Sequence, residues 1–159
     1  MRAFASTRPL PWLFLTVVLG LLAACGKGEG NAERGASGPV IWTLPVQDNG
    51  KESITIDGRT VSVGTARGWE TVEAAIEMMG TETLLRVELT ERELHDWGVY
   101  SSALRDQELV IRIADVDLMI LEGGPQLKSK GLWRVGPRET AEPRAQEVLK
   151  RLAEQAAAD

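Results

Sequence analysis

The side chains that could carry out acid–base or nucleophilic chemistry are few in this sequence. It contains one histidine, His95, and one cysteine, Cys25. A single cysteine cannot form a disulfide within the chain, and one Cys with one His supplies too few ligands for a Cys/His zinc site. His95 is followed by Asp96, but adjacent residues of a helix do not face each other. We therefore expect His95 to be a surface residue, and we predict no metal and no cofactor.

Acidic residues offer two further candidate sites. Asp115 and Asp117 lie between two expected strands, where clustered carboxylates could bind a hard cation. Aspartate is also a common turn residue, and we favour that role here. Glu88, Glu93 and Asp96 could in principle form the acidic site of an envelope hydrolase. An envelope hydrolase is thus one of the alternatives, and a non-catalytic binding module is the other.

Tryptophan side chains serve both protein cores and binding surfaces, because they are large and carry one hydrogen-bond donor. The sequence has four of them after residue 25: Trp42, Trp69, Trp97 and Trp133. Trp69 and Trp97 fall on expected helical apolar stripes, so we predict that they are core residues. Trp42 and Trp133 lie near the ends of expected strands, and we predict them as the candidate aromatic binding surface.

Cys25 stands at the end of a segment that is typical of secretory signal peptides. The preceding residues include Arg2 and Arg8 but no acidic residue, and Trp12–Ala24 is a 13-residue apolar run. A basic segment followed by about 7–15 apolar residues is the signal-peptide pattern. A permanent membrane span needs about 20 apolar residues. We therefore predict that residues 1–24 are a cleaved signal peptide rather than an apolar anchor helix with an incidental cysteine.

The end of this run, Leu22-Ala23-Ala24-Cys25, resembles the lipobox of bacterial lipoproteins. The resemblance implies that the Cys25 sulfur receives a diacylglycerol, that cleavage follows Ala24, and that the new amino terminus is acylated, as with palmitate. Two or more acyl chains anchor a protein stably, whereas one does so only marginally. Gly26 is not the aspartate associated with inner-membrane retention, so the resemblance favours an outer-membrane lipoprotein that faces the periplasm.

The segment after the cysteine predicts a tether. Gly26–Pro39 (GKGEGNAERGASGP) has no large apolar residue and cannot bury enough surface to order itself. As a random coil it would span roughly 20 Å. Cleavage would leave 135 residues with 16 basic and 23 acidic side chains, a net charge of −7. This acidity argues against nucleic-acid binding and against polybasic adhesion to a membrane.

Residues 40–159 are predicted to form a single domain. Period-two alternation of apolar residues and turn residues such as Asp57-Gly58 indicate strands and hairpins. The expected strands are Val40–Leu44, Ser53–Ile56, Thr60–Val63, Leu85–Leu89, Glu108–Ala114, Asp117–Glu122 and Gly131–Val135. The two hairpins are expected to turn at Asp57-Gly58 and at Asp115-Val116.

Helical spacing of apolar residues occurs in three segments. The expected helices are Trp69–Met79, ended by Gly80; a short helix after a capping box at Thr90–Glu93, ended by Gly98; and Thr140–Ala157, with Pro143 in its first turn. These elements predict an α+β fold: a mostly antiparallel sheet of hairpin-linked strands with two or three helices packed on one face.

The segment from Trp69 to Val135 resembles the bacterial domain-of-unknown-function family 4340. The similarity is carried by Thr90–Val99 (TERELHDWGV), followed by two strands and a Gly-rich link to another strand. The resemblance implies an envelope-facing, non-enzymatic role, sometimes alongside transport machinery, and it provides no catalytic residues. Together with the lipobox, it predicts a lipid-anchored accessory or binding module whose partner is another envelope protein or a small ligand. A small structural or assembly lipoprotein is a further alternative.

Overall fold

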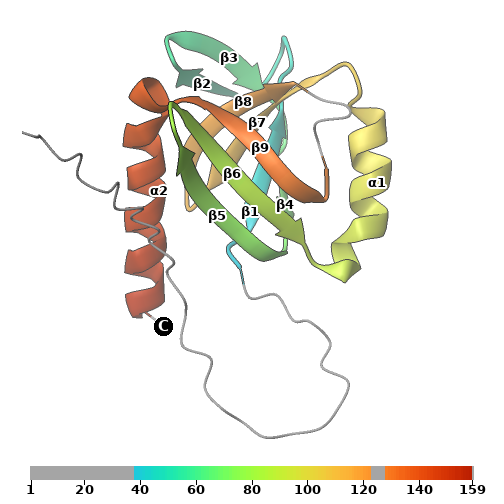
Figure 1. Ribbon diagram of the computed structural model, residues 1–159. Coiled ribbons are helices and arrows are strands. Elements are labelled where there is room, and N and C mark those ends of the chain that lie inside the picture. Colours follow the sequence, from blue (N-terminus) through green and yellow to red (C-terminus); the bar gives the residue numbers. More distant parts are fainter. Residues whose placement is uncertain (1–37, 123–127, 159) are drawn as a thin grey trace, which may run out of the picture. The chain divides into compact units, whose positions relative to one another are not determined.

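The computed structural model describes residues 38–122 and 128–158, and it confirms the predicted α+β class (Figure 1). The described strands pair antiparallel in three sheets, with strand orders β4-β1-β7-β8, β2-β3 and β5-β6-β9. The chain passes from the first sheet to the third at Glu70, between β4 (Arg67–Trp69) and β5 (Thr71–Met79). Away from this junction, β8 also lies against β9. The inner faces of the two larger sheets enclose the main core.

The first sheet is buried on both of its faces in its centre. It contains β1 (Ile41–Pro45), β7 (Glu108–Ile113) and β8 (Val116–Glu122) beside β4. In β7, alternate residues enter different clusters, because successive strand side chains point to opposite faces. Leu109 and Ile111 join the main core, whereas Val110 joins a second core on the outer face. This two-sided burial explains the almost continuous apolar run of β7.

The second core is covered by the predicted Asp57-Gly58 hairpin, which the structure confirms. β2 (Glu52–Ile56) and β3 (Arg59–Val63) pair across Asp57 and Gly58, whose φ angles are 51° and 76°. These left-handed conformations suit Asp and Gly in a tight hairpin turn. The hairpin lies over the outer face of the first sheet (Figure 1). Its buried residues pack with those of the sheet: Leu44, Ile54, Ile56, Val61, Val63 and Val110.

The second predicted hairpin forms, but its turn lies one residue earlier than expected. Ala114 and Asp115 have the positive φ angles, 48° and 64°, and Val116 already begins β8. A β-branched valine is strongly disfavoured at positive φ, so the turn cannot be centred on Asp115-Val116. Asp115 therefore occupies the turn position that we favoured for it.

The predicted helix at Trp69–Met79 is wrong, because the segment forms strands β4 and β5. β5 pairs along its length with β6 (Glu82–Leu89), which in turn pairs with β9 (Lys130–Pro137). Ala74 and Ile76 pack on the main core at period two. Sheet pairing here outweighs the helix propensity of the Ala, Glu and Met residues, as tertiary context often does. Gly80, with φ of 60°, serves the β5–β6 turn instead of ending a helix.

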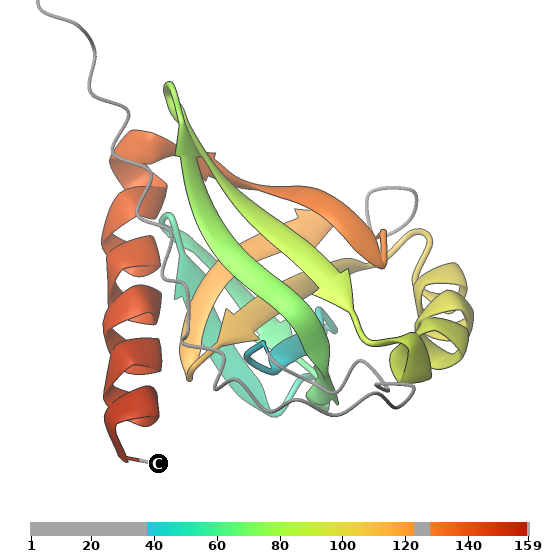
Figure 2. The ribbon, with the colours of Figure 1, turned by 60° about the horizontal axis from the view of Figure 1, so that its bottom comes forward.

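The two described α-helices lie on opposite sides of the strands, rather than together on one face as expected, as Figures 1 and 2 both show. A 3₁₀ turn, η1 (Glu91–Glu93), leads into α1 (Leu94–Ala103), which continues through Gly98 instead of ending there as predicted. The predicted capping box is not formed, because Thr90 makes no side-chain cap bond; its carbonyl instead accepts from the backbone N–H of Glu93 at 3.0 Å. The hydroxyl of Thr90 is buried and has no partner in the described structure.

The C-terminal helix α2 (Arg138–Ala158) begins directly at the end of β9 and packs mainly on β8, β6 and β9. Its buried residues are Ala141, Ala145 and Val148. The helix starts two residues earlier than predicted, so Pro143 lies in the second turn rather than the first. Arg138 donates its backbone N–H to the carbonyl of Thr81 at 2.8 Å, which fixes this start against the β5–β6 turn.

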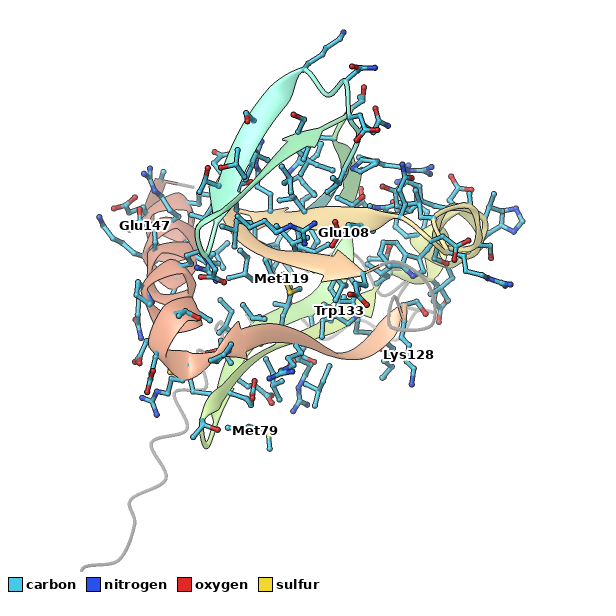
Figure 3. The ribbon with its side chains drawn as sticks, turned by 90° about the horizontal axis from the view of Figure 1, so that it is seen from above. Met79, Glu108, Met119, Lys128, Trp133 and Glu147 are labelled. Carbon is cyan, nitrogen blue, oxygen red and sulfur yellow. The ribbon has the colours of Figure 1, made fainter. Side chains whose placement is uncertain are left out.

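The main core lies between the inner faces of the two larger sheets, and α1 and α2 close its sides. Figure 3 shows Met119 pointing from β8 into the space between the sheets, while Met79 projects away from the tip of the β5–β6 hairpin. Met119 is 1% exposed and Met79 is 57% exposed. The core also includes Ile41, Leu85, Val87, Leu109, Ile111, Ile113, Leu118 and Leu121.

Two glycines predict opposite effects of the same substitution. A Cβ at Gly50 would lie 2.4 Å from the backbone nitrogen of Val63, whereas a Cβ at Gly98, inside α1, meets no atom within 4 Å. We expect Gly50→Ala to destabilise the protein by about 1–3 kcal/mol through overpacking. Gly98→Ala should stabilise it by about 0.5–1 kcal/mol through helix propensity. Urea unfolding of the two variants measures both effects, and equal effects would contradict the close approach of Gly50 to β3.

Candidate binding surface

Trp42 is an exposed aromatic side chain on the outer face of β1. Trp42 is 40% exposed. Val40, which precedes β1 and lies on the same side of the sheet, is also 40% exposed. In the sheet, Trp42 pairs with Gly68 of β4 on one side and with Arg112 of β7 on the other. We call Val40, Trp42 and Gly68 the Trp42 patch. It is the candidate binding surface, and Trp42 is the one of its residues that was predicted from the sequence.

Gly68 gives the patch its shape because it has no side chain. A Cβ at this position would lie 3.1 Å from Cζ3 of Trp42 and 3.2 Å from Cγ1 of Val40. The indole and the valine therefore both lie against the bare backbone of β4. The backbone of β4 thus holds two apolar side chains side by side at the surface. Exposed apolar residues that are scattered singly are ordinary, whereas these two are adjacent.

The prediction that Trp133 belongs to a binding surface is wrong. Trp133 is 2% exposed and points from β9 into the interior (Figure 3). Its ring stacks on Trp97 with centroids 5.7 Å apart and an interplanar angle of 13°. Its indole N–H donates to the carbonyl of Lys128 at 3.2 Å. The alternation of β9 places Trp133 on the same buried face as Val135, which accounts for its position.

Trp69 and Trp97 are core residues, as predicted, although Trp69 lies on a strand rather than a helix. Trp69 is 0% and Trp97 2% exposed. The two rings meet edge to face with centroids 4.8 Å apart, and Tyr100 of α1 lies 5.1 Å from Trp69. Offset and edge-to-face pairs of this kind stabilise a core beyond the area that they bury. The cluster attaches α1 to the strands.

The buried hydroxyl of Thr43, which bonds to this aromatic cluster, was not predicted from the sequence. The Trp69 indole N–H donates to Oγ1 of Thr43 at 2.9 Å, and the Thr43 hydroxyl bonds to the Tyr100 hydroxyl at 2.9 Å. Thr43 is fully buried. The alternation of β1 was the available signal, because Thr43 must share the inward face of Ile41. These bonds satisfy polar groups whose burial would otherwise be costly.

Arg67 links this cluster to the surface. Its guanidinium carbon lies 4.2 Å from the ring centroid of Trp69 and 5.5 Å from that of Tyr100. The guanidinium also donates to Asp96 of α1 at 2.9 Å. Both partners of this ion pair are largely exposed, so the pair itself adds little stability. Its arrangement nevertheless gives Asp96 an arginine partner, while His95 lies exposed on the surface as predicted.

Tyr100 is the only tyrosine of the sequence, so its ionisation can be followed alone. Burial raises the pKa of the Tyr100 hydroxyl, and this outweighs the Thr43 hydrogen bond and the Arg67 charge, which lower it. We expect tyrosinate absorbance to appear with a midpoint above the ordinary pKa of about 10. The Arg67→Met variant should move the midpoint higher still. A midpoint at or below the ordinary value would contradict the burial of this hydroxyl.

The same shift fixes the direction of a stability effect. Because the folded-state pKa of Tyr100 lies above its unfolded value, the folded state binds the proton more tightly. The corresponding stability is fully present below about pH 10 and is lost as the pH rises through the folded-state pKa. Tyr100→Phe should remove this alkaline component of the free energy of unfolding.

The candidate carboxylates Glu88 and Asp117 lie on different strands, and each is engaged in an ion pair. Glu88 of β6 pairs with Lys130 at 2.8 Å, and Asp117 of β8 pairs with Arg112 at 2.7 Å. Arg112 also bonds to Glu52 of β2. These carboxylates hold the pKa of the Arg112 guanidinium above its usual value. Within residues 38–122 and 128–158, no three His, Cys, Asp or Glu side chains gather as metal ligands would.

Two of the open hollows on the described surface lie away from the Trp42 patch. One is lined by Ser102, Ala103, Arg105, Asp106 and Gln107. The other is lined by Pro45, Gln47, Asn49, Gly50, Lys51, Gly64 and Thr65. A hydrolytic site of the predicted acidic kind needs two facing carboxylates. The first hollow contains one carboxylate and the second contains none.

Cys25 and the predicted signal peptide and tether up to residue 37 lie outside the described residues. Among the helices that the structure describes, none combines the length and the apolar character of a membrane span. The chain matches no known family model, no curated protein and no solved structure. The resemblances to lipoproteins and to family 4340 therefore stay predictions, and no catalytic family is indicated.

Proposed function

We propose that this protein is a lipid-anchored, non-catalytic accessory or binding module of the bacterial cell envelope. The observation that carries the proposal is Leu22-Ala23-Ala24-Cys25 at the end of a short apolar run. The Cys25 sulfur would carry the lipid, and the domain would face the periplasm, with the outer membrane favoured. The proposal includes no cofactor and no nucleic acid.

The position of the domain in the sequence supports this arrangement. The first described residues, Gly38 and Pro39, are bonded to Thr71: the Gly38 N–H donates to its carbonyl at 2.9 Å, and the Thr71 hydroxyl donates to the Pro39 carbonyl at 2.7 Å. Gly38 and Pro39, which were predicted as the end of the tether, are thus attached to the domain, and Gly38 lies 13 residues after Cys25. A Gly-rich segment of this length separates a lipidated residue from a folded domain by roughly 20 Å as a random coil.

The ion pairs support a binding role over the hydrolase. A hydrolytic acid–base pair needs carboxylates that face a common site and have distinct environments. Glu88 and Asp96 instead have the separate basic partners Lys130 and Arg67. Asp96, which follows the sole histidine, is directed toward Arg67. These ion pairs therefore favour a surface role for Glu88 and Asp96 over a catalytic one.

An envelope protein is the proposed partner, and a link to a transport system rests on the resemblance to family 4340. The test is a pull-down from detergent-solubilised envelopes with a tag fused after α2, whose last residues are exposed. A lipoprotein with the same signal segment and tag but another domain is the control. We expect one envelope protein to be enriched repeatedly over this control. If repeated pull-downs enrich no protein over the control, the proposed protein partner is contradicted.

A further inference from the structure

The Trp42 patch is fixed directly beside the point where the tether enters the domain. Val40 follows Gly38 and Pro39, which are bonded to Thr71 at the start of β5. The patch is therefore held next to the C-terminal end of the predicted tether. Other exposed large apolar residues are on different elements: Met79, Leu94, Val99, Leu132 and Leu149. None of these adjoins the tether in sequence.

The exposure of Trp42 is not required by the core. Its neighbours Ile41 and Thr43 face inward and are fully buried, while Trp42 faces outward on the opposite side of β1. An outward tryptophan on a backbone ledge presents an apolar ring with one N–H at its edge. Such amphipathic rings are enriched where proteins meet the headgroup region of membranes.

We propose that the Trp42 patch rests on the lipid surface, with the Trp42 indole in the headgroup region. This inference rests on the proposed lipid anchor at Cys25. Only 14 residues separate Cys25 from Val40, so the anchor keeps the patch close to the bilayer at all times. Because a short flexible linker makes the second contact intramolecular, at an effective concentration on the order of millimolar, a weak contact suffices.

The charge of the protein favours an aromatic contact over an electrostatic one. The chain after residue 24 has a net charge of −7, which repels anionic lipid headgroups. Insertion of an uncharged indole avoids this repulsion locally, and salt screens the remainder. With anionic vesicles, the contact of Trp42 should therefore strengthen as salt is added, opposite to the behaviour of polybasic adhesion.

Quenching of tryptophan fluorescence by lipids with brominated acyl chains tests the inference. The full mature protein is purified from membranes and reconstituted in phosphatidylcholine vesicles. The three other tryptophans of the mature chain are at most 2% exposed, and the Trp42→Phe variant isolates the contribution of Trp42. We expect a quenched component in the wild type that is lost in Trp42→Phe. Equal quenching of the two proteins would overturn the inference.

A second variant tests the orientation of the domain. Leu132 lies on the outer face of the β5-β6-β9 sheet and is 51% exposed. In the Trp42→Phe, Leu132→Trp double variant, the new tryptophan should not be quenched, whereas quenching there as strong as at residue 42 would contradict a fixed membrane-facing patch. If Trp42→Ala instead abolishes capture of an envelope protein without any quenching difference, the patch binds that protein and the inference fails.

Flotation separates this inference from the proposed function. Protein that does not float with the vesicles contradicts the lipid anchor and, with it, the inference. Protein that floats without a Trp42-dependent quenched component contradicts the inference alone and leaves the anchor intact.

Discussion

Replacing Cys25 with alanine should leave an uncleaved precursor that keeps the apolar run Trp12–Ala24 and no longer behaves as a lipoprotein. The thiol is the only group at this position that can take up the diacylglycerol, and the lipobox resemblance implies that cleavage follows this modification. The mature protein should partition into the detergent phase through its acyl chains, since each buried methylene contributes about 0.8 kcal/mol. Gel mobility and detergent-phase partitioning measure the two effects.

Ala24→Gly is the matched control for this experiment. It changes the adjacent residue but keeps a small side chain before the cysteine, so processing and partitioning should be retained. If Cys25→Ala still lost its first 24 residues and partitioned like the wild type, the lipid anchor would be wrong. Loss of processing in both variants would indicate that the segment does not tolerate change generally.

Trp97→Ala should destabilise the folded domain more than any surface substitution discussed above. Trp97 joins α1 to the strands through its edge-to-face contact with Trp69 and its stacked contact with Trp133. Truncation of a buried tryptophan costs about 3–5 kcal/mol, because it removes apolar burial and leaves a cavity. Urea unfolding of the detergent-solubilised mature protein, followed by circular dichroism, measures the free energy of unfolding.

Trp42→Ala is the control for that measurement, because it removes the same side chain from an exposed position. Surface substitutions usually change stability by no more than about 0.5 kcal/mol, and the partial contact of Trp42 with Gly68 should keep its effect far below that of Trp97. A loss as large as that of Trp97→Ala would mean that the Trp42 patch is structural rather than available for binding.

Local patterns predicted both Asp-containing hairpins and most of the described strands. The Asp57-Gly58 hairpin and the strand ending at Leu89 could be recognised from turn residues and from spacing. The helix after Thr90 was also expected from such signals, although its capping box does not form and it ends at Ala103 rather than at Gly98. In each, the turn or helical residues needed by the backbone are adjacent in sequence. The α+β class followed from the same signals, because hairpin-linked strands pair antiparallel.

The segment 69–79 could not be assigned from its own residues. Trp69, Val72, Ile76 and Met79 have helical spacing, but strand pairing was decided by β6, which follows it in sequence. The bulge between Thr71 and Glu73 shifts the alternation by one residue and so obscures the period of two. A bulge of this kind leaves no simple sequence signal.

The candidate site was predicted only in part, because the face on which a strand residue lies depends on distant elements. Whether a strand tryptophan faces the core depends on which face the neighbouring sheet covers. Trp133 lies in the main core and stacks on Trp97 of α1, whereas Trp42 is exposed and does not join the core under the β2–β3 hairpin. The Thr43–Tyr100 hydrogen bond joins residues 57 positions apart, so no local pattern could indicate it.

Mass spectrometry of the N-terminal peptide of the native protein tests the lipid anchor most directly. Protein extracted from bacterial envelopes should yield a first residue at position 25 whose sulfur carries a diacylglycerol and whose amino group is acylated. A peptide that starts at Met1, or one in which Cys25 has a free thiol, would contradict the assignment of this domain to a lipid anchor.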